Sequence, residues 1–284
     1  MGVLPSLAAR ARQLASAYHV ETANLLNSPR PDVPDSAAEA AFELNYSCAV
    51  STDSALLLLV DEHIWDADIL ARSIVEGTLK SLYLLSADAE GMESRAAEFF
   101  ETIPGCQAVS RLRKAHRLLE QVEDSNAADW YAVREVVEID SDAASEMERA
   151  SRASRQQVQE RWSFGGLVEH MAGIKDLQPM AVLGFKYAMQ SHLVHKDADG
   201  TGWMYARSEK EPSLREAAQA AHGARIVHDL LDMAGIRADM AKVVSARDAV
   251  ALWELEAQLD LLLRALRVLE PDGLRPKGSE SVHA

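Results

Sequence analysis

The chain has 284 residues, 48% of them hydrophobic, which is enough for a substantial core. Its net charge of −15 argues against nucleic acid as a general partner, although a local basic patch stays open. With only Cys48 and Cys106 present, a disulfide framework and a cysteine-based zinc site are excluded. We find neither a signal peptide nor an apolar run of about 20 residues, and therefore expect a cytoplasmic protein without a membrane span.

Helices are the predicted elements throughout. Glycine (14) and proline (9) are scarce while alanine and leucine are abundant, which predicts an all-α, multi-helix bundle with no sheet. Apolar periodicity and helix breakers place helices at residues 3–26, 36–61, 64–86, 89–102, 179–195, 212–235 and 246–269, and residues 106–138 have helical patterning with a turn near 124–126. The polar stretch at 142–161 is a solvated helix or a partly ordered connection, and 163–173 is a short helix or turn.

Local signals set several of these boundaries. A capping-box pattern at 36–39 starts the second helix, and the proline and glycine at 104–105 stop the helix before them. Pro179 suits the first position of a helix, and Gly235 suits a helix end. The segment at 197–203 has the composition of a loop.

The elements group into four parts along the chain. Residues 1–35 hold an N-terminal helix and a proline-rich linker, and 36–235 form the main helical domain. Residues 236–270 are a leucine-rich C-terminal helical segment, and 271–284 are a flexible tail. The two terminal helices would pack on the main domain or mediate self-association, so a homo-oligomer stays open.

One candidate site lies in the helix at 179–195, where Tyr187, Ser191 and His195 recur every four residues. On a helix these side chains stack on one face. His195 is the candidate general acid or base, because imidazole titrates near neutrality, and Tyr187 is a second catalytic candidate. Ser191 and His192 are candidate ligand-binding groups. Alternatively, these polar groups satisfy one another and the backbone at a helix end.

A second candidate lies on the helix at 64–86, where Arg72 and Glu76 can form an ion pair four residues apart. Tyr83 follows Glu76 by seven residues, on roughly the same face. Arg72 is a candidate for charge stabilisation in catalysis, and Glu76 and Tyr83 are candidates for ligand binding. On an exposed helix the pair would contribute only about 0.3–0.5 kcal/mol, whereas a buried pair is costly and indicates a site.

No cofactor motif is present, because the sequence lacks a Walker loop and the GxGxxG, GxSxG and HExxH patterns. His192 and His195 offer two imidazoles, but a metal site needs further ligands, so we expect neither a metal nor a cofactor. Arg111 and His116 fit the R-x4–6-H spacing of helical ribonucleases. The surrounding RLRKAHR segment is better explained as a solvated basic face.

Four short motifs follow one another over roughly residues 40–200. They are Arg72-x3-Glu76, Arg95-x3-Phe99, Trp162-Ser163 and Tyr187-x3-Ser191-x3-His195. In this order they resemble a bacterial family of helical proteins known only as a domain of unknown function. The resemblance implies an all-helical domain in which the Arg–Glu helix and the Tyr–Ser–His helix meet, and it implies no reaction. The chain departs from the family at 164–166, where Phe-Gly-Gly replaces a glycine and a basic residue.

Two classes of function follow from these observations. In the first, a polar pocket holds a small ligand, and the protein has a ligand-binding or regulatory role that works through a protein partner. The acidic surface and the lack of a catalytic motif favour this class. The alternative is a metal-independent, ribonuclease-like phosphodiesterase of the helical nucleotide-binding class, using His195 with Arg72 or Tyr187.

Overall fold

The computed structural model describes residues 2–149 and 152–269. Apart from an isolated antiparallel bridge between Pro29 and Ser245, these residues form no β-structure, so the predicted all-α, multi-helix fold is confirmed. The α-helices are α1 (Val3–Leu26), α2 (Asp35–Val60), α3 (Ile64–Leu85), α4 (Ala89–Ala97), α5 (Ile103–Gln121), α6 (Tyr131–Arg149), α7 (Arg152–Arg161), α8 (Phe164–Gly173), α9 (Val182–His195), α10 (Ala198–Ser208), α11 (Pro212–Val244) and α12 (Val250–Arg267). A π-helical turn covers Glu98–Thr102, and 3-10 helices cover Ala128–Trp130 and Lys175–Ala181.

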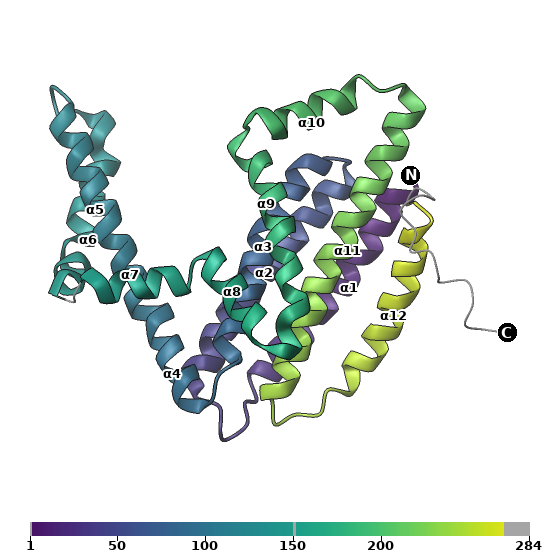
Figure 1. Ribbon diagram of the computed structural model, residues 1–284, viewed down its shortest axis with the longest axis horizontal. Coiled ribbons are helices and arrows are strands. Elements are labelled where there is room, and N and C mark those ends of the chain that lie inside the picture. Colours follow the sequence, from purple (N-terminus) through teal and green to yellow (C-terminus); the bar gives the residue numbers. More distant parts are fainter. Residues whose placement is uncertain (1, 150–151, 270–284) are drawn as a thin grey trace.

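The helices α1, α2, α3 and α11 pack side by side as the centre of the bundle (Figure 1). Helix α12 packs on α1 and α11, while α8 and α9 pack on α3. All side chains from Ser81 to Leu85 are buried, which shows that the C-terminal end of α3 is enclosed on every side. Helices α1 and α2 bury alanine-rich stripes that allow close approach. Before this end, α3 also has exposed and half-buried polar residues.

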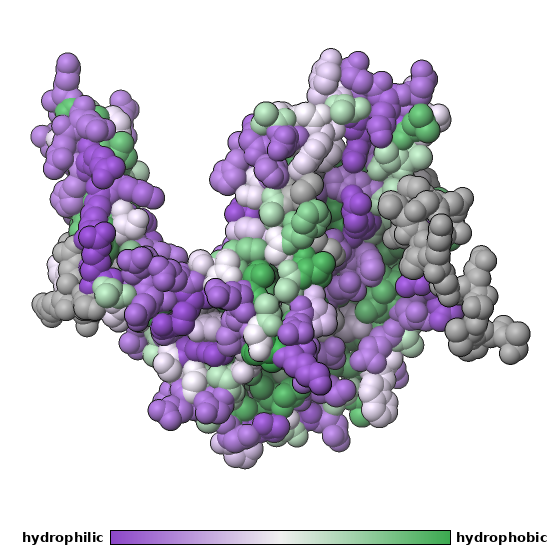
Figure 2. All heavy atoms as spheres, viewed as in Figure 1, coloured by the Kyte–Doolittle hydropathy of each residue, from purple (hydrophilic) through white to green (hydrophobic). Residues whose placement is uncertain are grey.

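Helices α5 and α6 form a hairpin that projects from the bundle (Figure 1) and presents mainly hydrophilic side chains on the face seen in Figure 2. Arg111 joins the two helices, since its Nε donates to Asp140 Oδ2 at 2.6 Å. His116 is exposed. Arg111, the first residue of the R-x4–6-H spacing, thus has a structural role in the hairpin.

Several expected helix boundaries are wrong. Helix α2 begins at Asp35 after Pro34 without a side-chain cap, so the 36–39 pattern does not start it. Pro104 lies in the first turn of α5 and does not stop a helix, because a first-turn N–H has no partner within the helix to lose. Pro179 lies inside a 3-10 helix, and α9 begins only at Val182.

Two further expected secondary-structure assignments, both in the C-terminal half of the chain, are wrong. The segment expected as a loop at 197–203 is largely helical, because the Asp197 carboxylate accepts from the Gly200 N–H at 3.0 Å and caps α10. Helix α11 continues through Gly235 to Val244, where packing on α1 and α3 holds it. The predicted tail at 271–284 lies outside the described residues, and the grouping of elements into domains stays a prediction.

No helix in the described ranges has a stretch long and apolar enough to cross a bilayer.

Gly77 on α3 faces α2 so closely that a Cβ there would overlap Cys48 Sγ. We expect Gly77→Ala to lower the free energy of unfolding by about 1–3 kcal/mol, because overpacking outweighs the better helix propensity of alanine. Gly235 is the matched control, since no atom lies within 4 Å of a Cβ built there. Gly235→Ala should raise the free energy of unfolding by about 0.5–1 kcal/mol. Urea denaturation measures both, and a stabilising Gly77→Ala would contradict the close packing of α2 on α3.

Candidate functional site

Arg72, Glu76 and Tyr187 come together where α9 packs on α3. Arg72 Nη2 donates to the Tyr187 hydroxyl at 2.6 Å, and the hydroxyl donates to Glu76 Oε2 at 3.3 Å. The direction is fixed because a guanidinium has no acceptor. Lys80 Nζ binds the second carboxylate oxygen of Glu76 at 2.7 Å. Burial, and then the charge of Glu76, raise the pKa of Tyr187, which therefore stays a neutral phenol.

The Tyr187 ring is held as firmly as its hydroxyl. The Phe164 ring stacks on it with centroids 3.4 Å apart and planes 8° apart. The Arg72 guanidinium carbon lies 4.3 Å from the centroid of the Tyr187 ring. These contacts join α8, α9 and α3, so the three residues fix the position of α9 on the bundle.

The other residues of the predicted Tyr–Ser–His face do not join this cluster. Each four-residue step along a helix turns by about 40°, so His195 lies about 80° around α9 from Tyr187. His195 is exposed, and Ser191 is half-buried. His192 Nδ1 lies 2.6 Å from Asp197 Oδ2, beside the start of α10.

Tyr83 also lies apart, in an aromatic cluster at the end of α3. Its ring makes edge contacts with Trp162 and His170 at centroid distances of 5.0 and 4.9 Å. The Arg95 guanidinium carbon lies 4.0 Å from the Tyr83 centroid. Burial, and then Arg95, lower the pKa of His170. Tyr83 is 4% exposed, which makes it a core residue of this cluster.

A second polar network is centred on Asp68. Asp68, one turn before Arg72 on α3, accepts from Gln190 Nε2 at 3.0 Å, and its other oxygen lies 2.8 Å from His222 Nε2. Arg207 Nη1 donates to His222 Nδ1 at 2.7 Å. The network thus connects α3, α9, α10 and α11.

The hydrogen bonds determine the form of the His222 ring. Because Arg207 can only donate, His222 Nδ1 must accept, and the single ring proton is then on Nε2. That N–H donates to Asp68, so both ring nitrogens are engaged. His222 is therefore a neutral connector between a cation and a carboxylate.

A cavity of about 440 Å³ opens beside this network, between α3, α9, α10 and α11. Trp65, Trp203 and Leu193 supply apolar wall, and Arg207 and Arg225 supply positive charge. The Arg207 guanidinium carbon lies 4.5 Å from the Trp65 ring centroid. Burial, and then the nearby charge of Arg225, lower the pKa of Arg207. The cavity has the size and the mixed lining of a small-molecule site.

None of the site residues predicted from the sequence is among the residues that line this cavity. Asp68 lies four residues before Arg72, so the helical spacing that linked Arg72 to Glu76 also leads to Asp68. No spacing signal leads to Arg207 or His222, since they lie on helices that only tertiary packing brings to α3.

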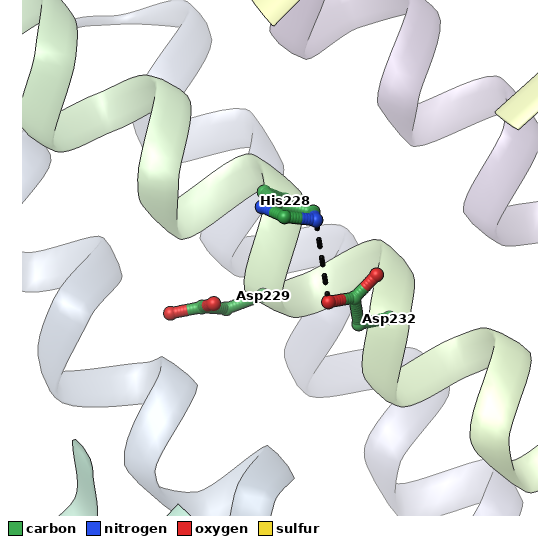
Figure 3. A group of neighbouring side chains, drawn as sticks. All are labelled: His228, Asp229 and Asp232. Carbon is green, nitrogen blue, oxygen red and sulfur yellow. Dashed lines mark ion pairs between the residues drawn. The ribbon is translucent and has the colours of Figure 1, made fainter. Parts of the chain in front are cut away.

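His228, Asp229 and Asp232 form another group of polar side chains on α11 (Figure 3). One ligand atom of each lies within 4.8 Å of the others, and His228 Nε2 is 3.4 Å from Asp232 Oδ2. In Figure 3 the Asp229 side chain extends away from that pair, and Asp229 lines the cavity. Because all three are partly exposed on one helix, we assign no metal to them.

No family model matches the chain, and searches of curated proteins and of solved structures found no match. The resemblance to a helical family of unknown function stays a prediction. The geometry of the cavity is therefore the basis for proposing a function.

Proposed function

We propose that this protein binds a small organic anion with an aromatic or apolar body in the cavity between α3, α9, α10 and α11. The observation that carries the proposal is the pair of neighbouring guanidinium groups, Arg207 and Arg225, in a wall that also contains Trp65 and Trp203. Arg207 donates to a neutral imidazole, and the carboxylates of Asp68 and Asp229, which also line the cavity, offset part of the positive charge. An anion placed between the two guanidinium groups would reduce their remaining repulsion. The indoles would contact the body of the ligand.

The geometry favours binding over catalysis. Both nitrogens of His222 are engaged, which leaves no free site for proton transfer. His195, on which the ribonuclease-like alternative depends, is exposed and is not among the residues that line the cavity. A ligand-binding or regulatory role is thus the better-supported class.

The proposal can be tested with a fluorescent probe of matching chemistry, 8-anilinonaphthalene-1-sulfonate. We expect it to bind the wild-type protein with a rise in fluorescence, and Arg225→Met to weaken binding about tenfold, as loss of one charged contact would. N-phenyl-1-naphthylamine has the same aromatic body without the sulfonate, and Arg225→Met should leave its binding unchanged.

Arg264→Met is the matched control, because this arginine is on α12 and pairs with Asp260 at 2.6 Å on the surface. It should leave the binding of both probes unchanged. Equal loss of sulfonate binding in Arg225→Met and Arg264→Met would contradict the charge assignment. Failure of both probes to bind the wild-type protein would contradict the site itself.

A further inference from the structure

Arg237 on α11 lies in the centre of the bundle and is 2% exposed. Its Nη1 donates to Thr78 Oγ1 at 2.5 Å, its Nε to Asn45 Oδ1 at 3.4 Å, and its Nη2 lies 3.4 Å from His19 Nδ1. These three groups are neutral, and among the described residues Arg237 forms no ion pair. A buried charge without a counter-ion is costly, and buried charges are normally paired.

No neighbouring group in the described ranges supplies the missing negative charge. An ionised Cys48 thiol would favour the charged form of Arg237, but burial raises the pKa of this thiol and keeps it protonated. A guanidinium stays protonated in proteins. The bundle therefore encloses one positive charge that lacks a partner.

His19 and Asn45 connect this charge to a second cavity, of about 430 Å³, between α1 and α2. Both residues contact Arg237 and both line the cavity. His19 Nδ1 lies 3.4 Å from Arg237 Nη2 and 3.4 Å from Asn45 Oδ1. Arg237 can only donate, so when Nδ1 accepts from it the ring proton is on Nε2, and Nε2 is buried without a hydrogen-bond partner. Burial, and then Arg237, lower the pKa of His19 to about 3, so the ring is neutral.

The rest of the cavity is mostly apolar, with Phe42, Val20 and Val50 in its wall. At its rim Arg12 is already paired, since Nη2 donates to Asp53 Oδ2 at 2.9 Å. Among the described residues, Arg237 is then the cation without a counter-ion beside this cavity, and it lies behind His19 and Asn45 without lining the cavity itself. It would be balanced by a ligand with a single negative charge and an apolar body.

We propose that the cavity between α1 and α2 binds a small monocarboxylate. The carboxylate accepts the His19 Nε2–H, and Arg237, behind the ring, supplies the opposite charge. The apolar body of the ligand lies along Phe42 and Val50. This site is separate from the cavity that contains Arg207, and it does not rest on the function proposed there.

Calorimetric titration with benzoate, and with benzamide as its neutral counterpart, tests this site. We expect the wild-type protein to bind benzoate and not benzamide. Arg237→Met should weaken benzoate binding about tenfold or more. Without ligand, the same variant should have a higher Tm than the wild-type protein, because an unpaired buried charge is gone. Because the cavity that contains Arg225 is also proposed to bind organic anions, these titrations are made in an Arg225→Met background, in which benzoate should still bind to the cavity between α1 and α2.

A second variant, Ala49→Phe in the same Arg225→Met background, fills the space beside the cavity wall and leaves Arg237 in place, and it should also abolish benzoate binding. It keeps the test open if Arg237→Met does not fold. The proposal is overturned if benzoate does not bind, or if benzamide binds equally well. It is also overturned if Ala49→Phe retains binding, or if Arg225→Met alone abolishes it, since benzoate would then occupy the other cavity.

Discussion

Replacing Asp68 with alanine should lower the free energy of unfolding by about 3 kcal/mol, because it leaves buried donors without an acceptor. The Asp68 side chain is 13% exposed and accepts from both His222 and Gln190. Truncation removes both hydrogen bonds and also the negative charge that favours protonated Arg207. Urea denaturation of the two proteins measures the difference.

Two further variants separate the causes of this loss. In Asp68→Asn the side-chain oxygen can still accept from His222. The new Nδ2 amide group can donate to Gln190 if the Gln190 amide rotates by 180°, which brings Gln190 Oε1, buried without a partner in the wild-type protein, into position as the acceptor. We expect a loss of about 1 kcal/mol. Asp66→Ala, exposed on the same helix, should cost about 0.5 kcal/mol through the helix dipole. An Asp68→Ala loss as small as that of Asp66→Ala would contradict the buried network.

The fold was predictable where one local signal dominates. The helices expected at 3–26 and 64–86 match α1 and α3, because apolar periodicity and flanking breakers agree there. The expected end at Gly235 failed because burial along α11 outweighs the cost of a glycine in a helix, about 1 kcal/mol. Glycine is thus a weak stop signal in a helix that packs along its whole length.

The candidate site was predictable only within single helices. The four-residue spacing on α3 linked Arg72 to Glu76, and the polar face of α9 pointed to Tyr187. The same spacing did not lead to a contact for His195, because two four-residue steps rotate the side-chain direction by about 80° around the helix axis. Arg237 carried no signal, since nothing local distinguishes a buried arginine from the exposed ones on the same helix.

Acidification should destabilise the protein through His19. Burial, and then the charge of Arg237, lower the pKa of this imidazole from 6.5 to about 3, while Asn45 and the more distant Asp53 act in the opposite direction. Between these values the unfolded chain binds a proton that the folded protein does not, so stability falls as the pH falls from about 6.5 towards about 3. From pH 7 to pH 4.5 we expect this residue to account for a loss of about 2.5 kcal/mol.

Comparison with His19→Gln isolates this contribution, because the amide oxygen can accept from Arg237 but glutamine does not titrate. Other groups add to the acid sensitivity of both proteins, so the measured quantity is the difference between their free energies of unfolding at each pH. That difference should change by about 2.5 kcal/mol between pH 7 and pH 4.5. Parallel pH profiles would mean that His19 titrates alike in the folded and unfolded states. Such a result would contradict its burial beside a charged Arg237.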